Sequence, residues 1–327
     1  MNDARFSIVI SCYSDERWNS LVVAVESLER QTLLPREIII VVDHNPGLFE
    51  RARTRWPGLV VVESNERAGL SGARNTGLGY ANAPFVAFLD DDAFAESDWL
   101  ERLAAHYRNS AVMGVGGVVV PAWIEPRPAW FPPEFDWVVG CSHIGMPQKT
   151  SAVRNLIGAN MSFRREVLVG MRGFRHGLGR VGVVPLGCEE TDLCIRAGQR
   201  WTARLLVYEP AARVRHEVPP KRSTWAYFLS RCYGEGVSKA LLSRMVGGDD
   251  ALASERYYVS RTLPGGAVDA LVTAMRHRDV THAARAAAIA AGLTVAVCGF
   301  LAASLRRPKP RLLKEDPATA ELDSRSK

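Results

Sequence analysis

Residues 65–93 read NERAGLSGARNTGLGYANAPFVAFLDDDA and carry the clearest structural pattern of the chain. The uncharged, mostly apolar run at residues 84–89 is typical of a buried strand. A helix is expected before it, over residues 70–80. The strand leads into three consecutive aspartates, Asp90, Asp91 and Asp92. A helix followed by a buried strand is the repeating unit of α/β proteins, so the stretch predicts that class.

Further apolar runs precede this unit, at residues 6–10, 37–42 and 59–62. A helical pattern fills residues 18–31, and the alternation predicts a mainly parallel central sheet flanked by helices. Ligands of such sheets bind at the carboxyl ends of the strands. Asp43 and the aspartate triplet both follow predicted strands, so we expect them to share a site. A turn-capping role for Asp43 is the alternative.

The triplet favours a metal site. Adjacent carboxylates repel one another, and a divalent cation such as Mg²⁺ or Mn²⁺, shared with diphosphate oxygens, neutralises them. A solvated acidic turn is the alternative. The glycine-rich segment before the triplet contains Arg67 and Arg74, which suit phosphate groups. Arg74 is equally suited to pair with Asp90.

Composition sets broad limits on the function. Of 327 residues, 47% are hydrophobic and 23% charged, which is ordinary for a globular protein and excludes general disorder. The net charge of +6 is compatible with phosphate-bearing ligands or a membrane surface. We expect six free thiols and a cytoplasmic protein, because no leader pattern opens the chain. Nothing suggests a nucleic-acid partner.

The C-terminal third predicts a helical extension over residues 223–305, following a catalytic domain at residues 1–222. Its last part, residues 286–305, is uncharged and about long enough to span a bilayer, but alanine-rich. A basic, then polar tail at residues 306–327 is expected to be disordered. We expect peripheral attachment at the cytosolic face of the cell membrane. A buried helix packed on the catalytic domain is the alternative.

Several segments, in this order, resemble family 2 glycosyltransferases. They are SIVISCYSDE (7–16), EIIIVVDHN (37–45), residues 65–93, GANMSFRREVLVGMRGF (158–174) and GCEETDLCIRAGQ (187–199). The resemblance covers roughly residues 5–217. It implies a GT-A nucleotide-diphospho-sugar transferase fold and inverting transfer to a hydroxyl of a glycan or polyprenyl-linked acceptor.

The resemblance also implies roles for individual residues. Asp92 becomes a direct metal ligand, and His216 a third metal contact. Glu190 becomes the general base, although the commoner residue there is aspartate, and Glu189 is the second candidate. Gly158 and Asn160 would shape the acceptor or donor-sugar pocket. The residues expected to hold the nucleotide sugar are Ser11, Cys12, Tyr13, Asp43, Arg67, Arg74, Asp90 and Asp91.

Two other functions remain open at this point. A sugar-phosphate nucleotidyltransferase would use a similar sheet, but it usually has a glycine-rich basic loop after the first strand, where this chain has SCYSDE. A non-catalytic nucleotide-sugar-binding protein would not need the acidic residues of a catalytic site, so the presence of Asp90, Asp92 and Glu190 argues against it. The QxxRW element of processive synthases is absent from the sequence, so we expect single additions.

Overall fold

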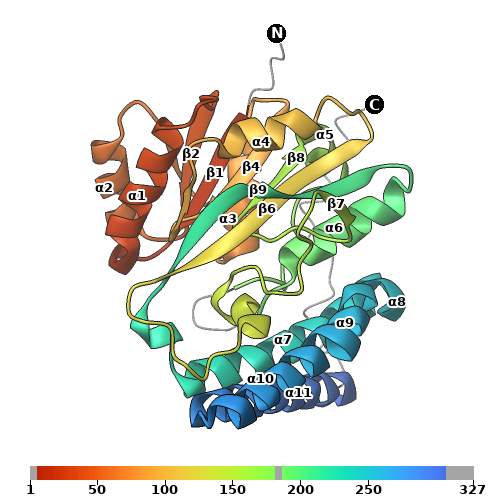
Figure 1. Ribbon diagram of the computed structural model, residues 1–327. Helices are drawn as coiled ribbons and strands as arrows, with labels where there is room; N and C mark the ends of the chain where they lie inside the picture. The colour runs from red at the N-terminus through yellow and green to blue at the C-terminus, as the bar shows by residue number, and fades with distance from the viewer. Residues whose placement is uncertain (1–5, 181–185, 307–327) are drawn as a thin grey trace.

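A nine-stranded mixed sheet forms the centre of the protein in a computed structural model, which describes residues 6–180 and 186–306 (Figure 1). Eight strands follow the order β3-β2-β1-β4-β8-β6-β9-β5, and β7 pairs with β9. Their bounds are β1 Phe6–Cys12, β2 Glu37–Val42, β3 Val60–Glu63, β4 Phe85–Asp90, β5 Ala93–Ala95, β6 Val112–Trp123, β7 Ser151–Val153, β8 Met161–Arg164 and β9 Leu205–Val218. The predicted α/β class is confirmed.

The parallel half of the sheet contains β1 to β4, as the apolar runs predicted. Alternate residues of β1 enter opposite cores, so Ile8 packs with one layer of helices and Val9 with the other. The first layer holds α1 (Trp18–Glu29), α2 (Pro46–Arg55) and α4 (Trp99–His106), and the second holds α3 (Leu70–Tyr80), α5 (Arg165–Gly170) and α6 (Glu189–Arg200). Burial on both faces explains why β1, β2 and β4 are almost continuously apolar.

The other half of the sheet is more mixed than expected. Strand β8 is antiparallel to both β4 and β6, whereas the long strands β6 and β9 are parallel to each other. Strand β5 is antiparallel to β9, in a register that places Ala93 opposite His216. This pairing brings His216 next to the aspartate triplet, although the two are far apart in the sequence.

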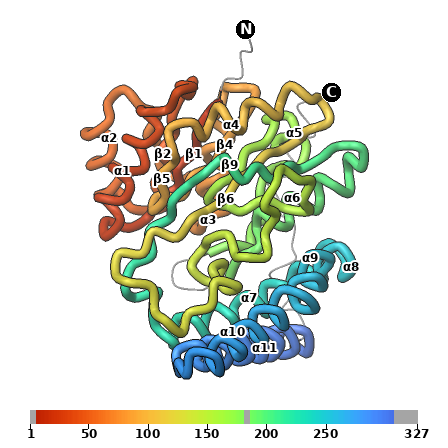
Figure 2. The backbone as a smooth tube through the Cα atoms, viewed as in Figure 1, coloured from red at the N-terminus to blue at the C-terminus, as the bar shows by residue number. Residues whose placement is uncertain are grey.

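A layer of helices lies below the sheet, formed by α7 (Trp225–Val246), α10 (Leu263–His277) and α11 (Val280–Leu305) (Figures 1 and 2). Short helices α8 (Gly248–Ala251) and α9 (Ala253–Tyr257) and a π-helical turn (Tyr258–Thr262) connect α7 to α10. Helices α7 and α11 touch closely, because a Cβ at Gly236 would collide with the backbone of Ala296. Within helix α11 an 18-residue window has a mean hydropathy of 2.2, so by length and composition the helix could cross a membrane. The expected tail beyond residue 306 lies outside the described residues.

A stretch rich in proline and tryptophan, residues 121–147, joins the sheet to the helical layer. Strand β6 extends into it as far as Trp123, and a 3₁₀ helix follows at Pro133–Val139. Phe131 and Phe135 pack against Phe228 of α7 in one core. Glu134 is buried and accepts a hydrogen bond from Arg285 of α11 at 2.8 Å. The stretch is therefore ordered and holds the helical layer against the sheet.

Candidate active site

A cavity of about 1040 Å³ lies where the carboxyl ends of β1, β2 and β4 face the helical layer. The sheet side of its wall includes Asp43 and the aspartate triplet, and the opposite wall comes from α7, α9 and α11. The strand ends therefore meet at one site, as the sequence predicted.

Asp92 is the most strongly charge-paired residue of the cavity. It is only 5% exposed, and its carboxylate contacts Arg222 at 3.0 Å, His216 at 3.0 Å and Arg17 at 3.3 Å. Burial alone would raise the pKa of Asp92, but His216, Arg17 and Arg222 hold it well below its ordinary value. Asp92 is therefore ionised at neutral pH, as a metal ligand must be.

Asp90, Asp92 and His216 form a donor set suited to a divalent cation. Their ligand atoms all lie within 4.8 Å of one another. Nδ1 of His216 is buried and meets no hydrogen-bond partner within residues 6–180 and 186–306. Carboxylate and imidazole donors suit Mg²⁺ or Mn²⁺, and the second accepts nitrogen more readily. The residues present therefore fit the metal that the sequence predicted.

Asp91 lies apart from this donor set. Its Oδ1 accepts a hydrogen bond from Arg17 at 2.5 Å. Burial raises the pKa of Asp91 to about 7, although Arg17 opposes the shift. Arg17 follows the first strand and contacts both Asp91 and Asp92, which the sequence reasoning missed.

Arg74 joins the aspartate triplet to the second acidic pair. It is buried and donates hydrogen bonds to Asp90 at 3.2 Å, to Glu189 at 2.8 Å and to the carbonyl oxygen of Gly158 at 3.1 Å. The predicted pairing of Arg74 with Asp90 is thus present. With two carboxylates as partners, its charge is already compensated within the protein.

Glu189 and Glu190 differ in environment although they are adjacent at the start of α6. Glu189 is 5% exposed and paired to Arg74. Glu190 lines the cavity, and its carboxylate accepts a hydrogen bond from the hydroxyl of Thr191 at 3.2 Å. Burial and the charge of Glu189 raise the pKa of Glu190 to about 8, against the opposing charges of Arg74 and Lys239. A carboxylate with so high a proton affinity is suited to act as a base.

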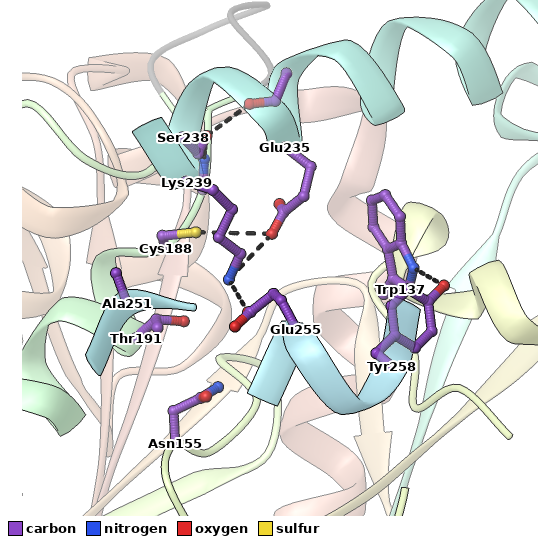
Figure 3. Close-up of polar contacts among 12 residues, drawn as sticks. Trp137, Asn155, Cys188, Thr191, Glu235, Ser238, Lys239, Ala251, Glu255 and Tyr258 are labelled. Atoms are coloured by element: carbon purple, nitrogen blue, oxygen red, sulfur yellow. Dashed lines mark hydrogen bonds and ion pairs between the residues drawn. The ribbon is translucent and has the colours of Figure 1, made fainter. Parts of the chain in front are cut away.

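The polar residues Glu235, Lys239 and Glu255 of the helical layer lie close together, as Figure 3 shows, and they line the same cavity as Glu190. Lys239 of α7 contacts Glu235 at 3.3 Å and Glu255 of α9 at 2.7 Å. The hydroxyl of Ser238 accepts a hydrogen bond from the backbone N–H of Gly187 at 3.1 Å. Helix α7 therefore anchors the segment that carries the two glutamates. Sequence reasoning did not find these residues, because only the three-dimensional packing brings them to the site.

The remaining predicted residues divide into two groups. Ser11, Cys12, Tyr13 and Gly158 line the cavity. Asp43 also lines it and accepts a hydrogen bond from the backbone N–H of Gly69 at 2.8 Å. The capping role considered for Asp43 belongs instead to Asn45, whose side chain accepts from the N–H of Leu48.

Asn160 and Arg67 do not contribute to the cavity as expected. Asn160 is fully buried; its amide donates to the carbonyls of Val118 and Ala212 at 2.9 Å, and its oxygen accepts from Trp99 at 2.8 Å. It braces the sheet and has no hydrogen-bonding group left for a sugar. Arg67 is exposed and stands outside the residues that line the cavity.

Lys221 and Arg222 lie next to each other in the short 3₁₀ helix after β9 but differ in their surroundings. Lys221 is exposed and pairs with Glu16 at 3.0 Å, as expected of a solvated turn. Arg222 next to it is 4% exposed and points to Asp92. The turn therefore supplies one surface cation and one cation of the site.

Comparisons with known proteins agree with this geometry. The family model described as glycosyl transferase family 2 matches residues 7–170. A glucosyl-dolichyl phosphate glucuronosyltransferase of Haloferax volcanii is 36% identical over 242 residues, covering 73% of this chain and 77% of that protein. The succinoglycan biosynthesis protein ExoM of Rhizobium meliloti is 28% identical, covering 61% of this chain and 62% of its own length.

Solved structures show the same fold. A mannosyltransferase of Pyrobaculum calidifontis, in complex with GDP-Man and Mn²⁺, aligns with a TM-score of 0.56 at 18% identity and covers 91% of this chain and 87% of its own. GalNAc-T7 with UDP, GalNAc and Mn²⁺ aligns with a TM-score of 0.51 at 16% identity, covering 80% of this chain and 57% of its own.

Proposed function

Because this chain belongs to glycosyl transferase family 2, we propose that it transfers a single sugar from a nucleotide-diphosphate donor to an acceptor hydroxyl, with inversion at the anomeric carbon. The chain is a glycosyltransferase of the GT-A type. One observation supports the finer proposal. A metal-type donor set and the carboxylate of Glu190 line the same cavity.

Glu190 is proposed as the general base. Its carboxylate takes the proton of the acceptor hydroxyl while the hydroxyl oxygen forms a bond to the anomeric carbon of the donor sugar. The bond from that carbon to the phosphate oxygen breaks, and the nucleoside diphosphate leaves from the opposite face. Attack and departure on opposite faces invert the configuration, and the protein contributes by holding both partners in line.

The donor is proposed to lie along the sheet side of the cavity. Ser11, Cys12, Tyr13 and Asp43 would hold the base and ribose. Asp90, Asp92 and His216 would hold Mg²⁺ or Mn²⁺, which when bound supplies positive charge to the departing diphosphate. Arg17 and Arg222 contact Asp92 and would remain beside the negatively charged diphosphate.

The acceptor is proposed to be lipid-linked. The Haloferax relative is named for a glucosyl-dolichyl phosphate acceptor, and helix α11 is long and apolar enough to associate with a membrane. We propose a catalytic domain at residues 1–222 and a helical extension at residues 223–305 that lies on the cytosolic face of the cell membrane. A glycan acceptor is the second candidate.

A donor panel tests the proposal. Purified protein is incubated with UDP-, GDP- and TDP-sugars in Mn²⁺ or Mg²⁺, with and without a crude lipid fraction. We expect one donor to be consumed faster when lipid is added, and the sugar to appear in the organic phase with inverted configuration. Release of pyrophosphate from a nucleoside triphosphate and a sugar phosphate would instead indicate a nucleotidyltransferase. Binding of a donor without any turnover would contradict catalysis.

A further inference from the structure

The cavity continues beyond Glu190 along the helical extension, and this part of its wall is apolar. It passes between the π-helical turn and helix α11. A single π-helical turn is uncommon and often marks a functional site. The apolar side chains that line this branch are Leu252, Leu263, Leu293, Ala296, Val297 and Phe300.

The polar groups at the entrance to this branch are already paired. Lys239 contacts both Glu235 and Glu255 (Figure 3). Arg154 donates two hydrogen bonds to Glu255, at 2.6 and 2.9 Å. Two cations and two carboxylates compensate one another. A sugar hydroxyl would gain little by competing with these ion pairs, whereas an apolar chain can pass them without breaking any.

The apolar branch reaches the surface of α11. Val297 lines the cavity and is also 47% exposed, and Leu301 on the next turn is 53% exposed. Further exposed apolar residues of the extension are Val268, Leu271, Val272 and Met275 of α10 and Leu305 of α11. Helix α11 lies on the side of the molecule away from the sheet (Figure 1). An exposed apolar face that continues a catalytic cavity is typical of a lipid-binding route.

We propose that this branch binds the hydrocarbon chain of the lipid-linked acceptor. The chain enters beside Glu190, where the acceptor sugar reacts, and leaves past Val297 toward the membrane. The inference rests on the proposed function, since it assigns a site to the lipid part of that acceptor. The extension is then part of the acceptor site as well as the surface that meets the membrane.

A pair of substitutions on one helix face separates these two roles. Val297→Asp places a charge at the mouth of the branch, and aspartate is too short to reach away from it. Leu301→Asp is the matched control, because Leu301 is similarly exposed but does not line the cavity. The acceptor probes are sugar monophosphate esters with either a short alkyl chain or a long isoprenoid chain, both dissolved in detergent.

For the long-chain probe, we expect Val297→Asp to raise KM about tenfold, the change that follows when about two methylene groups lose burial. The short-chain probe and donor hydrolysis should be unaffected, and Leu301→Asp should behave as the wild type. Equal use of short and long chains by the wild-type protein would overturn the inference and leave the proposed function intact. Failure to consume any donor would instead refute the proposed function.

A binding experiment does not depend on turnover. An isoprenyl phosphate with a photoactivatable group on its chain is cross-linked to the full-length protein, and the adducts are mapped by mass spectrometry. We expect adducts within residues 252–263 and 293–300, and their loss in Val297→Asp. Adducts confined to residues 268–275, or no adducts at all, would contradict the site and indicate contact with the outer face only or with a protein partner.

Discussion

Replacing Asp92 by asparagine tests the metal site through stability as well as activity. In the metal-free protein the carboxylate is buried among Arg17, Arg222 and His216. Asparagine keeps an oxygen acceptor but leaves these side chains without their counter-charge. Removing one partner of a buried ion pair lowers the free energy of unfolding by about 3–5 kcal/mol. Because asparagine keeps an oxygen acceptor, we expect a loss at the lower end, about 3 kcal/mol. This loss corresponds to a fall in Tm of roughly 5–10 °C.

Metal binding is expected to stabilise the wild-type protein and so to raise its Tm. An ion that binds only the folded state at a hundred times its Kd stabilises it by about 2.7 kcal/mol. We therefore expect excess Mn²⁺ to raise the Tm of the wild-type protein, but not that of Asp92→Asn. Transfer activity should be lost in the variant, and in the wild type treated with EDTA.

Thermal melting with EDTA and with Mn²⁺ measures both effects. Asp98→Asn is a suitable control, because Asp98 pairs with Arg102 on the surface of α4 and an exposed pair contributes little. An equal gain in Tm with Mn²⁺ in the wild type and in Asp92→Asn would refute the assignment of Asp92 as a ligand. A variant with unchanged Tm in EDTA would refute the electrostatic argument.

Glu190→Gln should lower kcat by about 10²–10⁴-fold while calorimetry finds donor affinity unchanged, and an inactive Glu189→Gln with an active Glu190→Gln would reverse the assignment. Because Glu190 acts when deprotonated and its pKa is about 8, initial rates in the wild type should rise with pH up to about that value, and a flat profile between pH 6 and about 9 would contradict the role. Gly236→Ala should prevent α7 from packing on α11 and lower Tm strongly, whereas Gly248→Ala, which meets open space, should not. In fractionated cells, high salt or carbonate should release the full-length protein, and a version without residues 264–327 should be soluble; extraction by detergent alone would indicate true insertion.

Local patterns were sufficient to predict the parallel half of the sheet. Strands β1, β2 and β4 are buried on both faces, so their sequences are continuously apolar and are easily recognised. Strand β9 was missed, although its second half alternates between buried and exposed residues from Ala212 to Val218. Strand β6 was missed because Gly114, Gly116 and Gly117 weaken the signal of a strand. These glycines permit close approach, since a Cβ at Gly116 would lie 2.6 Å from the backbone oxygen of Asn160.

The site was harder to predict than the fold. Asp92 and His216 are joined by the register of β5 on β9, and resemblance rather than local pattern pointed to them. Arg17 was missed because no short-range pattern encodes its contact with Asp92 across the sheet edge. Asn160 was instead predicted to be in the pocket but does not line it. A polar residue in a familiar motif was expected in the pocket, but its side chain points into the sheet, and sequence does not specify that direction.

The guanidinium of Arg74 links the part of the site proposed for the donor to the part proposed for the acceptor. One of its nitrogens contacts Asp90, on the donor side, and the other contacts Glu189, whose charge raises the proton affinity of Glu190. When a cation draws Asp90 toward itself, Arg74 is left to compensate Glu189 more fully. Each pKa unit by which Glu190 then falls corresponds to about 1.4 kcal/mol. Arrival of the donor would thus prepare the base for the acceptor.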